Sequence, residues 1–493
     1  MEKTQIILFV LGFSLALSGC VDNKLSPKQN NFSTGPGHPS GLVARTPPMG
    51  WNSFDAYDCR INEQEFKTVV DFMDKNLKSY GWQYAVIDYI WFHPEPGNWN
   101  NPDRRFGHPN IRYKPTGEPV DPLVMDVFGR LIPAENRFPS AAGGRGFKPL
   151  ADFVHSKGMK FGIHIMRGIP REAWYKNSPI KDSKFRARDI AEPWDTCNWS
   201  NHMFGVDPTK EGAQEYYNSL FELYASWEVD FIKADDMMFP DFHKGEIEMM
   251  QKAIQKCGRP MVLSLSCGEA PLSQANHLAG NANMWRISGD FWDNWGDLLH
   301  SFTLLNAWSP FIQENHWPDA DMIPIGHLSL GGRPHGPDRM SKFTIPEHYT
   351  LMTLWSIARS PLMIGADLLS TPDSILAFLK NEEVLQVNQR SADNRQVMRR
   401  DSQVVWIATD PEQGDRFVAL FNLSNRPKEV VFELEWEYMR GKYMVRDLWA
   451  KKDLASCENL FKIKLPAHGA GLYRFSPEKM PINQVTGAGR GAN

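Results

Sequence analysis

Short apolar runs alternate with longer amphipathic segments between residues 45 and 380. The apolar runs are nearly continuous and end in a polar residue, which is typical of parallel strands buried on both faces. We predict strands at 84–88, 160–164, 230–235, 261–265 and 284–288. Apolar residues at i, i+3, i+4 and i+7 predict helices at 63–77, 147–155, 212–226, 245–256 and 347–359. The alternation indicates βαβ units around a parallel sheet.

Repeated strand–helix units over residues 42–388 favour a (β/α)8 barrel. A doubly wound open sheet is the alternative, but no Gly-rich phosphate turn follows the first predicted strand. After about residue 389 the pattern changes to short runs separated by turn residues, at 403–408, 416–421, 429–434, 443–448 and 471–475. The sequence therefore predicts an α/β barrel followed by an antiparallel β-sandwich domain at 389–478 and a disordered tail at 479–493.

The N-terminus has the pattern of an export signal. Lys3 precedes an uncharged apolar stretch at 6–17, which is too short to cross a bilayer as a helix. The stretch ends in Leu17-Ser18-Gly19-Cys20, which resembles a bacterial lipoprotein cleavage box. Cleavage by the ordinary signal peptidase is the alternative. We interpret 1–20 as a lipoprotein signal peptide with Cys20 as the lipid anchor, and 21–41 as a flexible tether. This predicts an exported protein, periplasmic or on the outer-membrane surface, that meets the membrane only through its lipid.

Composition narrows the choice of partner. The 493 residues are 42% apolar and 23% charged, as in globular proteins. Lys and Arg number 54 against 58 Asp and Glu, and without a basic run the net charge of -4 argues against nucleic acid. The 17 Trp residues suit both core packing and stacking on sugar rings.

Apart from Cys20, the chain has an odd number of cysteines, and their spacing does not suggest a zinc site. The sequence leaves any disulfide pairing among them open: Cys59, Cys197, Cys257, Cys267 and Cys457.

Carboxylates dominate the polar residues near the ends of the predicted strands, where the working groups of a parallel barrel lie. The candidates are Asp88, His164, Lys233, Asp235, Asp236, Cys267, Glu269, Arg286, Asp290, Asp293, Asp319 and Asp321. No nucleophile elbow and no His-rich ligand set accompany them, which disfavours acyl transfer and metal-dependent hydrolysis. Two facing carboxylates are what glycoside hydrolysis requires. A single strand-end Asp is more often a helix cap or a loop acceptor, so this pattern alone is weak evidence.

A series of motifs, in order, resembles glycoside hydrolase family 27. They lie at 46–53, 84–88, 137–139, 150–163, 230–235, Arg286 with Asp290, 317–322 and 360–363. The resemblance spans about 45–389 and the β-domain. The family contains α-galactosidases, α-N-acetylgalactosaminidases, β-L-arabinopyranosidases and isomalto-dextranases, so the resemblance implies a carbohydrate substrate and calls for no metal or organic cofactor.

The resemblance implies that Asp235 is the nucleophile and Asp290 the general acid/base of a retaining mechanism. Lys233, two residues before Asp235 on the same strand face, favours the ionised carboxylate. Asp290 has to start protonated, which a second carboxylate roughly 5 Å away promotes. The purely structural alternatives are a Lys233–Asp236 ion pair and an Arg286–Asp293 ion pair.

The resemblance also implies a set of sugar-binding residues. They are Trp51, Asp88, Tyr89, His164, Lys233, Cys267, Glu269, Arg286 and Asp321. Trp51, Trp91 and Trp285 are either stacking platforms or core residues.

The motifs depart from the family around the substrate. In the family's α-galactosidases, two consecutive Asp residues end the second strand, whereas here Tyr89 follows Asp88. His164 stands where the family has a Tyr, Phe54 where it has a Trp, and Met237 where it has a disulfide-forming Cys. These changes suggest altered specificity with unchanged chemistry.

The leading prediction is an exo-acting α-galactosidase. A β-L-arabinopyranosidase or an α-glucan-acting relative is the alternative within the same chemistry, and Tyr89 favours it. A non-catalytic glycan-binding lipoprotein is the alternative from another class, and the presence of both Asp235 and Asp290 argues against it. We also expect the Pro-rich segment 93–131 to form a lid over the pocket, rather than a surface insertion packed on the β-domain.

Overall fold

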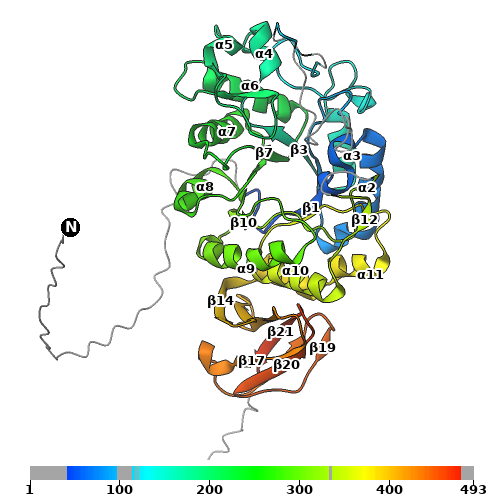
Figure 1. Ribbon diagram of the computed structural model, residues 1–493, viewed down its shortest axis with the longest axis vertical. Coiled ribbons are helices and arrows are strands. Elements are labelled where there is room, and N and C mark those ends of the chain that lie inside the picture. The colour runs from blue at the N-terminus through cyan, green and yellow to red at the C-terminus, as the bar shows by residue number, and fades with distance from the viewer. Residues whose placement is uncertain (1–41, 97–113, 117–118, 120–121, 332–335, 479–493) are drawn as a thin grey trace, which may run out of the picture. The chain divides into compact units, whose positions relative to one another are not determined.

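The computed structural model describes residues 42–96, 114–116, 119, 122–331 and 336–478 (Figure 1). The predicted signal peptide, the lipid-anchor Cys20, the tether and the tail at 479–493 lie outside the described residues. Among those described, no helix combines the length and the apolar character needed to cross a membrane.

Eight parallel strands form one sheet in which neighbours in space are neighbours in chain order. They are β1 (Met49–Asn52), β2 (Tyr84–Ile87), β3 (Lys160–Met166), β7 (Phe231–Asp235), β8 (Val262–Leu265), β9 (Met284–Arg286), β10 (Trp317–Asp319) and β13 (Leu362–Ile364). A parallel bridge between Ile323 and Ile364 joins the β10 edge to the β13 edge, and the Ile323 N–H donates to the Met363 carbonyl over 2.7 Å. The sheet is therefore closed, and the predicted barrel is confirmed.

Helices connect the barrel strands along the chain (Figure 1). The longer ones are α2 (Glu63–Asn76), α3 (Lys148–Ser156), α6 (Ala213–Ser226), α7 (Lys244–Cys257), α8 (Ala275–Asn281), α9 (Trp295–Trp308), α10 (Ile345–Ile357) and α12 (Glu382–Arg390). The shorter ones are α1 (Phe54–Tyr57), α4 (Arg171–Lys176), α5 (Ala187–Ile190) and α11 (Asp373–Leu376). Two small sheets lie in the loops, one of β4 (Ile169–Pro170), β5 (Ala191–Glu192) and β6 (Met203–Val206), the other of β11 (His327–Leu328) and β12 (Arg339–Met340).

Helix α2 shows how local sequence sets these elements. Its buried face carries Phe66, Val69, Val70 and Met73, each fully shielded from solvent. Burying a side chain of this size contributes about 1.5–3 kcal/mol. The helix begins at a capping box, in which the Asn62 side chain accepts the N–H groups of Gln64 and Glu65 and the Glu65 carboxylate accepts the Asn62 N–H.

The C-terminal region is an antiparallel sandwich, as predicted. Its strands are β14 (Ala392–Arg400), β15 (Gln403–Thr409), β16 (Arg416–Asn422), β17 (Lys428–Glu433), β18 (Tyr443–Asp447), β19 (Lys452–Asp453), β20 (Leu460–Leu465) and β21 (Ala470–Pro477). Strands β17 and β20 pair separately from the six-stranded sheet β14–β15–β16–β21–β18–β19, and apolar side chains of both sheets share one core. Helix α10 packs on β16 and β21, and the Thr350 hydroxyl donates to the His468 carbonyl.

The cysteines of the described region are all free thiols, so no disulfide forms there: Cys59, Cys197, Cys257, Cys267 and Cys457.

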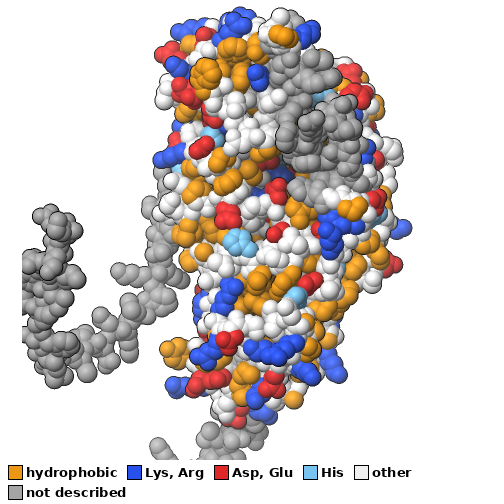
Figure 2. All heavy atoms as spheres, viewed as in Figure 1, with side chains coloured by type: hydrophobic (Ala, Val, Ile, Leu, Met, Phe, Trp, Pro, Cys, Tyr) orange, Lys and Arg blue, Asp and Glu red, His pale blue; other side chains and the backbone are white. Residues whose placement is uncertain are grey.

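Figure 2 shows acidic and basic side chains interspersed over the face that it presents, which agrees with the nearly balanced charge of the chain.

Much of the segment expected to form a lid, including 97–113, lies outside the described residues. Its described C-terminal part packs on helices of the barrel. The Leu123 N–H donates to the Glu172 carboxylate of α4 over 3.1 Å, and the Arg130 guanidinium donates to the Ser219 carbonyl of α6 over 2.8 Å. The lid stays a prediction.

The capping box yields a prediction about stability. Replacing Asn62 with Ala leaves two N–H groups of the first turn without their acceptor, so we expect the free energy of unfolding to fall by about 0.5–2 kcal/mol in chemical denaturation. The exposed Gln64→Ala variant in the same turn serves as the control and should change it by less than about 0.5 kcal/mol. Equal effects of the two substitutions would contradict the capping role.

Candidate active site

A cavity of about 330 Å³ lies at the carboxyl ends of the barrel strands. Its lining comes from loops that follow most of the strands: Phe54, Asp55, Asp88, Tyr89, Trp199, Lys233, Asp235, Phe239, Ser266, Cys267, Gly268, Arg286, Gly289, Asp290, Phe291, Trp292, Asp321 and Met322. Most of the residues named from the sequence meet here, including both predicted catalytic carboxylates.

Lys233 and Asp88 form a buried ion pair at one side of the cavity, with 2.8 Å between Nζ and Oδ2. The Asn52 amide donates to the same oxygen over 2.6 Å, and the Tyr89 N–H donates to Oδ1 over 2.8 Å. Burial alone would raise the pKa of Asp88, but Lys233, the nearby His164 and the Tyr89 N–H hold it well below its ordinary value. Asp88 is therefore an ionised acceptor.

Asp235 ends β7 and is ionised as well. Its Oδ2 lies 3.1 Å from Nε2 of the buried His164, and its Oδ1 accepts the Asp236 N–H over 2.8 Å. A carboxylate can only accept, so the His164 contact requires a hydrogen on Nε2. Burial opposes ionisation of Asp235, but the His164 hydrogen bond and the charge of Lys233 lower its pKa overall. The side chain is 13% exposed, toward the cavity.

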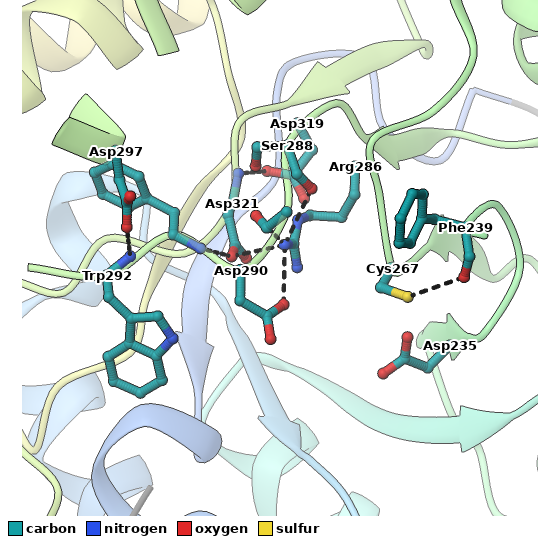
Figure 3. Close-up of polar contacts among 12 residues, drawn as sticks. Asp235, Phe239, Cys267, Arg286, Ser288, Asp290, Trp292, Asp297, Asp319 and Asp321 are labelled. Carbon is teal, nitrogen blue, oxygen red and sulfur yellow. Dashed lines mark hydrogen bonds and ion pairs between the residues drawn. The ribbon is translucent and has the colours of Figure 1, made fainter. Parts of the chain in front are cut away.

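Arg286 ends β9 and organises the opposite side. Its Nη2 lies 3.1 Å from Asp290 Oδ1 and 2.9 Å from Asp321 Oδ2. Figure 3 shows the guanidinium group between these two carboxylates, with Asp235 and Cys267 across an open space. The Asp290 side chain is 60% exposed, while that of Asp321 is buried. Of the two predicted catalytic carboxylates, Asp235 thus lies in the wall of the cavity and Asp290 at its mouth.

Asp319 and Asp321 form an acidic cluster beneath Arg286. Burial, reinforced by Asp321, raises the pKa of Asp319 to about 7, against the opposing effect of Arg286. Burial also raises the pKa of Asp321. Asp319 does not line the cavity, and its carboxylate accepts the Asp321 N–H over 2.9 Å, so it supports Asp321 from behind.

Tyr89 is fixed as an aromatic wall. Its hydroxyl lies 2.9 Å from the Ser200 hydroxyl and 3.4 Å from His202 Nδ1. Its ring packs edge-on against Trp199, with 5.5 Å between the ring centroids. Because the phenol already has partners in the protein, the side chain offers the cavity mainly its ring.

Three expected sugar contacts, Trp51, Glu269 and His164, do not line the cavity. Trp51 is completely buried, and its indole N–H donates to the Ala366 carbonyl over 2.9 Å, so it belongs to the core. Trp91 and Trp285 are also completely buried and belong to the core. Glu269 does not line the cavity, because its carboxylate is turned toward His300, 2.9 Å away. His164 also lies behind the lining, where it contacts Asp235 rather than the open space.

The alternative structural ion pairs, Lys233–Asp236 and Arg286–Asp293, do not form. Lys233 pairs with Asp88, while Asp236 pairs with Arg167 over 2.9 Å. Arg286 does not pair with Asp293, which pairs with Arg339 over 2.6 Å. The two cations that face the cavity are thus bound to carboxylates of the site itself.

The sequence interpretation missed several cavity residues. They include Asp55, Trp199, Phe239, Phe291 and Trp292, together with Phe54, which the sequence marks only as a replacement of the family's Trp. Phe54 and Asp55 lie two and three residues after the end of β1, and this place near a strand end was the available signal.

Among the described residues, two clusters have metal-ligand geometry, Asp152–His155–Glu228 and Asp195–His243–Glu246. Neither lines the cavity. In the Asp195–His243–Glu246 cluster, Nη1 of Arg167 lies 2.7 Å from a carboxylate oxygen of Asp195 and of Glu246. The guanidinium group therefore already neutralises these two carboxylates.

Comparison with known proteins adds independent information. The family model described as alpha galactosidase A matches residues 207–390, and the model described as alpha galactosidase C-terminal beta sandwich domain matches 400–475. The crystal structure of a GH27 β-L-arabinopyranosidase from Geobacillus stearothermophilus is 46% identical, covers 90% of this chain and 99% of its own, and superposes with a TM-score of 0.83. A variant of that enzyme was crystallised with arabinose.

Curated relatives are more distant. An α-galactosidase of Oryza sativa is 26% identical over 443 residues, covering 88% of this chain and 86% of the rice protein. Alpha-galactosidase 3 of Arabidopsis thaliana is 27% identical over 458 residues, covering 90% and 84%.

Proposed function

The chain belongs to glycoside hydrolase family 27, and from this premise we propose that it is a retaining exo-glycosidase that releases terminal β-L-arabinopyranosyl residues. The proposal rests on the observation that Asp235 and Asp290 line the same cavity. Asp235 is ionised and lies in the cavity wall, whereas Asp290 is exposed at the cavity mouth. That it is a glycoside hydrolase follows from the family itself.

The proposed reaction has two displacements. In the first, Asp235 Oδ attacks the anomeric carbon, the glycosidic C–O bond breaks, and Asp290 gives its proton to the departing oxygen. In the second, water attacks the same carbon, Asp290 takes a proton from the water, and the bond to Asp235 breaks. The anomeric configuration is thereby retained. His164 and Lys233 support the first step because they keep Asp235 ionised.

The size of the cavity supports exo action. At about 330 Å³ it lies at the small end of the range for ligand pockets, which suits one sugar ring rather than a chain.

Tyr89 supports the choice of sugar. Arabinopyranose has the ring hydroxyl arrangement of galactose but lacks the 6-hydroxymethyl group. Asp88 retains one of the two acceptors of the α-galactosidases, while the ring of Tyr89 replaces the second. A hydroxymethyl group placed against this ring and Trp199 would lose hydrogen bonds to water without replacing them. The 46% identity to a β-L-arabinopyranosidase points the same way.

An α-galactosidase is the second candidate, favoured by the matched family models and the plant relatives. The two candidates share all the chemistry of the site and differ only in what occupies the space beside Tyr89.

The substrate is tested with aryl glycosides. We expect kcat/KM for an aryl β-L-arabinopyranoside to exceed that for the matched α-D-galactopyranoside by about 10-fold or more. Tyr89→Asp, which restores a second acceptor, should shift the ratio toward the galactoside, while Tyr89→Phe, which keeps the ring, should preserve it. A wild-type preference for the galactoside would favour the second candidate.

The acid/base role is tested through the leaving group. Asp290→Ala should lower kcat/KM about 10²- to 10⁴-fold for sugars with poor leaving groups, and much less for aryl glycosides with acidic phenols, which need little protonation. Glu269→Ala provides a matched carboxylate that does not line the cavity, and its activity should stay near wild type. Equal losses on both kinds of substrate would contradict the assignment of Asp290.

The pH profile tests the electrostatics of Asp235. The His164 hydrogen bond lowers the pKa of Asp235, so His164→Phe should raise it and move the acid limb of the kcat/KM profile upward by about one pH unit. Activity at acidic pH would then fall while activity near neutrality persists. His277→Phe, whose ring pairs with Glu248 away from the cavity lining, should leave the acid limb in place. An unmoved limb in His164→Phe would rule out this electrostatic role.

We further propose that the chain is exported as a bacterial lipoprotein anchored through Cys20, on the support of residues 17–20. Expressed in a bacterial host with radiolabelled palmitate, the wild type and Cys457→Ser should carry lipid and sediment with membranes. Cys20→Ser should do neither. Unlabelled wild-type protein would contradict the anchor.

A further inference from the structure

Asp55 is a cavity residue that the proposed mechanism does not use. It lies in the one-turn helix α1, directly after β1, and its side chain is buried yet lines the cavity. Its Oδ2 is shielded from solvent and has no hydrogen-bond partner among the described residues. A buried carboxyl oxygen without a partner is uncommon, because nearly all buried polar groups are paired.

The other charged groups of the lining are paired with one another. Asp88 is bound to Lys233, and Arg286 is bound to Asp290 and Asp321. Asp235 accepts from His164. Asp55 is the exception within the described lining, although four of these charged groups act on it electrostatically.

We propose that the Asp55 carboxyl binds a hydroxyl group of the terminal sugar and helps to determine which sugar is accepted. The inference rests on the proposed function, because it assigns Asp55 to the sugar of that same site.

The surroundings of Asp55 are shaped to hold the carboxyl group. A Cβ atom at Gly365, the residue after β13, would lie 1.9 Å from Oδ2 and 2.5 Å from Cγ. The absence of a side chain at 365 therefore creates the space that the carboxyl fills. Helix α1 is fixed in turn, because the Asp55 carbonyl accepts the Ser329 N–H over 2.8 Å.

The chemistry of the group suits a hydroxyl. Burial, reinforced by the nearby charge of Asp321, raises the pKa of Asp55 well above its ordinary value. A neutral carboxyl group carries one O–H donor and one carbonyl acceptor, and a sugar hydroxyl is likewise both a donor and an acceptor. A sugar hydroxyl in the cavity would meet the part of the carboxyl group that is turned away from Gly365, because Oδ2 itself is shielded from solvent against that glycine.

The test combines variants of Asp55 with deoxy sugars. Wild type and Asp55→Ala are assayed on the aryl β-L-arabinopyranoside and on its 2-, 3- and 4-deoxy analogues. We expect Asp55→Ala to lower kcat/KM about 10-fold or more on the parent glycoside, mainly through KM. On the analogue that lacks the contacted hydroxyl, the two enzymes should agree within about twofold, because the interaction is already gone. This coupling identifies the hydroxyl, and a merely structural role would not produce it.

Further variants separate binding from folding. Asp55→Asn keeps a donor and an acceptor and should stay within about threefold of wild type. Gly365→Ala keeps the carboxyl but places a methyl group where Oδ2 lies, and should raise KM as Asp55→Ala does. Asp367→Asn is the control: its buried carboxylate accepts from Tyr57 of the same helix and does not line the cavity, so KM should not change.

Two outcomes would overturn the inference. In one, Asp55→Ala lowers kcat/KM by the same factor on the parent glycoside and on every analogue. In the other, Asp55→Ala and Gly365→Ala both match wild type. If wild type hydrolyses neither the arabinopyranoside nor the galactoside, the proposed function fails instead, and the assay distinguishes this result from a failure at Asp55 alone.

Discussion

The rest of the site depends on the charge of the Lys233 ammonium group and its ion pair with Asp88. The ammonium group lies 2.8 Å from Asp88, and it favours the ionised forms of the buried Asp88 and the largely buried Asp235. Burying a single charge without a partner is costly, so Lys233 and its carboxylates are stable only together. The order of the strands brings them together, because β2, which precedes Asp88, and β7, which carries Lys233 and Asp235, both lie beside β3.

Asp235 and Asp290 differ in how far their side chains are exposed, and this difference matches their proposed roles. Asp235 is held by His164 in the wall, whereas Asp290 is held by Arg286 at the solvent-exposed mouth. An attacking carboxylate needs a fixed position and a charge, whereas a proton donor and acceptor needs access to the leaving group and to water. The proposed determinants of specificity, Asp55 and Tyr89, lie elsewhere in the cavity lining, in the segments that follow β1 and β2.

The sequence was sufficient for the barrel and for most of the catalytic constellation, because continuous apolar runs such as 160–164 mark buried strands and the residues that follow them meet at one end. Periodicity did not reveal β1, β10 and β13, which are only three or four residues long. Trp51 and Glu269 were misplaced because the direction of a side chain depends on tertiary packing. Asp55 was missed because a polar residue in a one-turn helix gives no periodic signal.

The central claim is that Asp235 and Asp290 act on one sugar by two successive displacements. The most direct measurement is proton NMR of the first product that wild type releases from an aryl β-L-arabinopyranoside, recorded before mutarotation. We expect β-L-arabinopyranose, the configuration of the substrate, because two inversions at the anomeric carbon restore it. Initial release of the α-anomer would show a single displacement by water and would contradict the role of Asp235 as nucleophile.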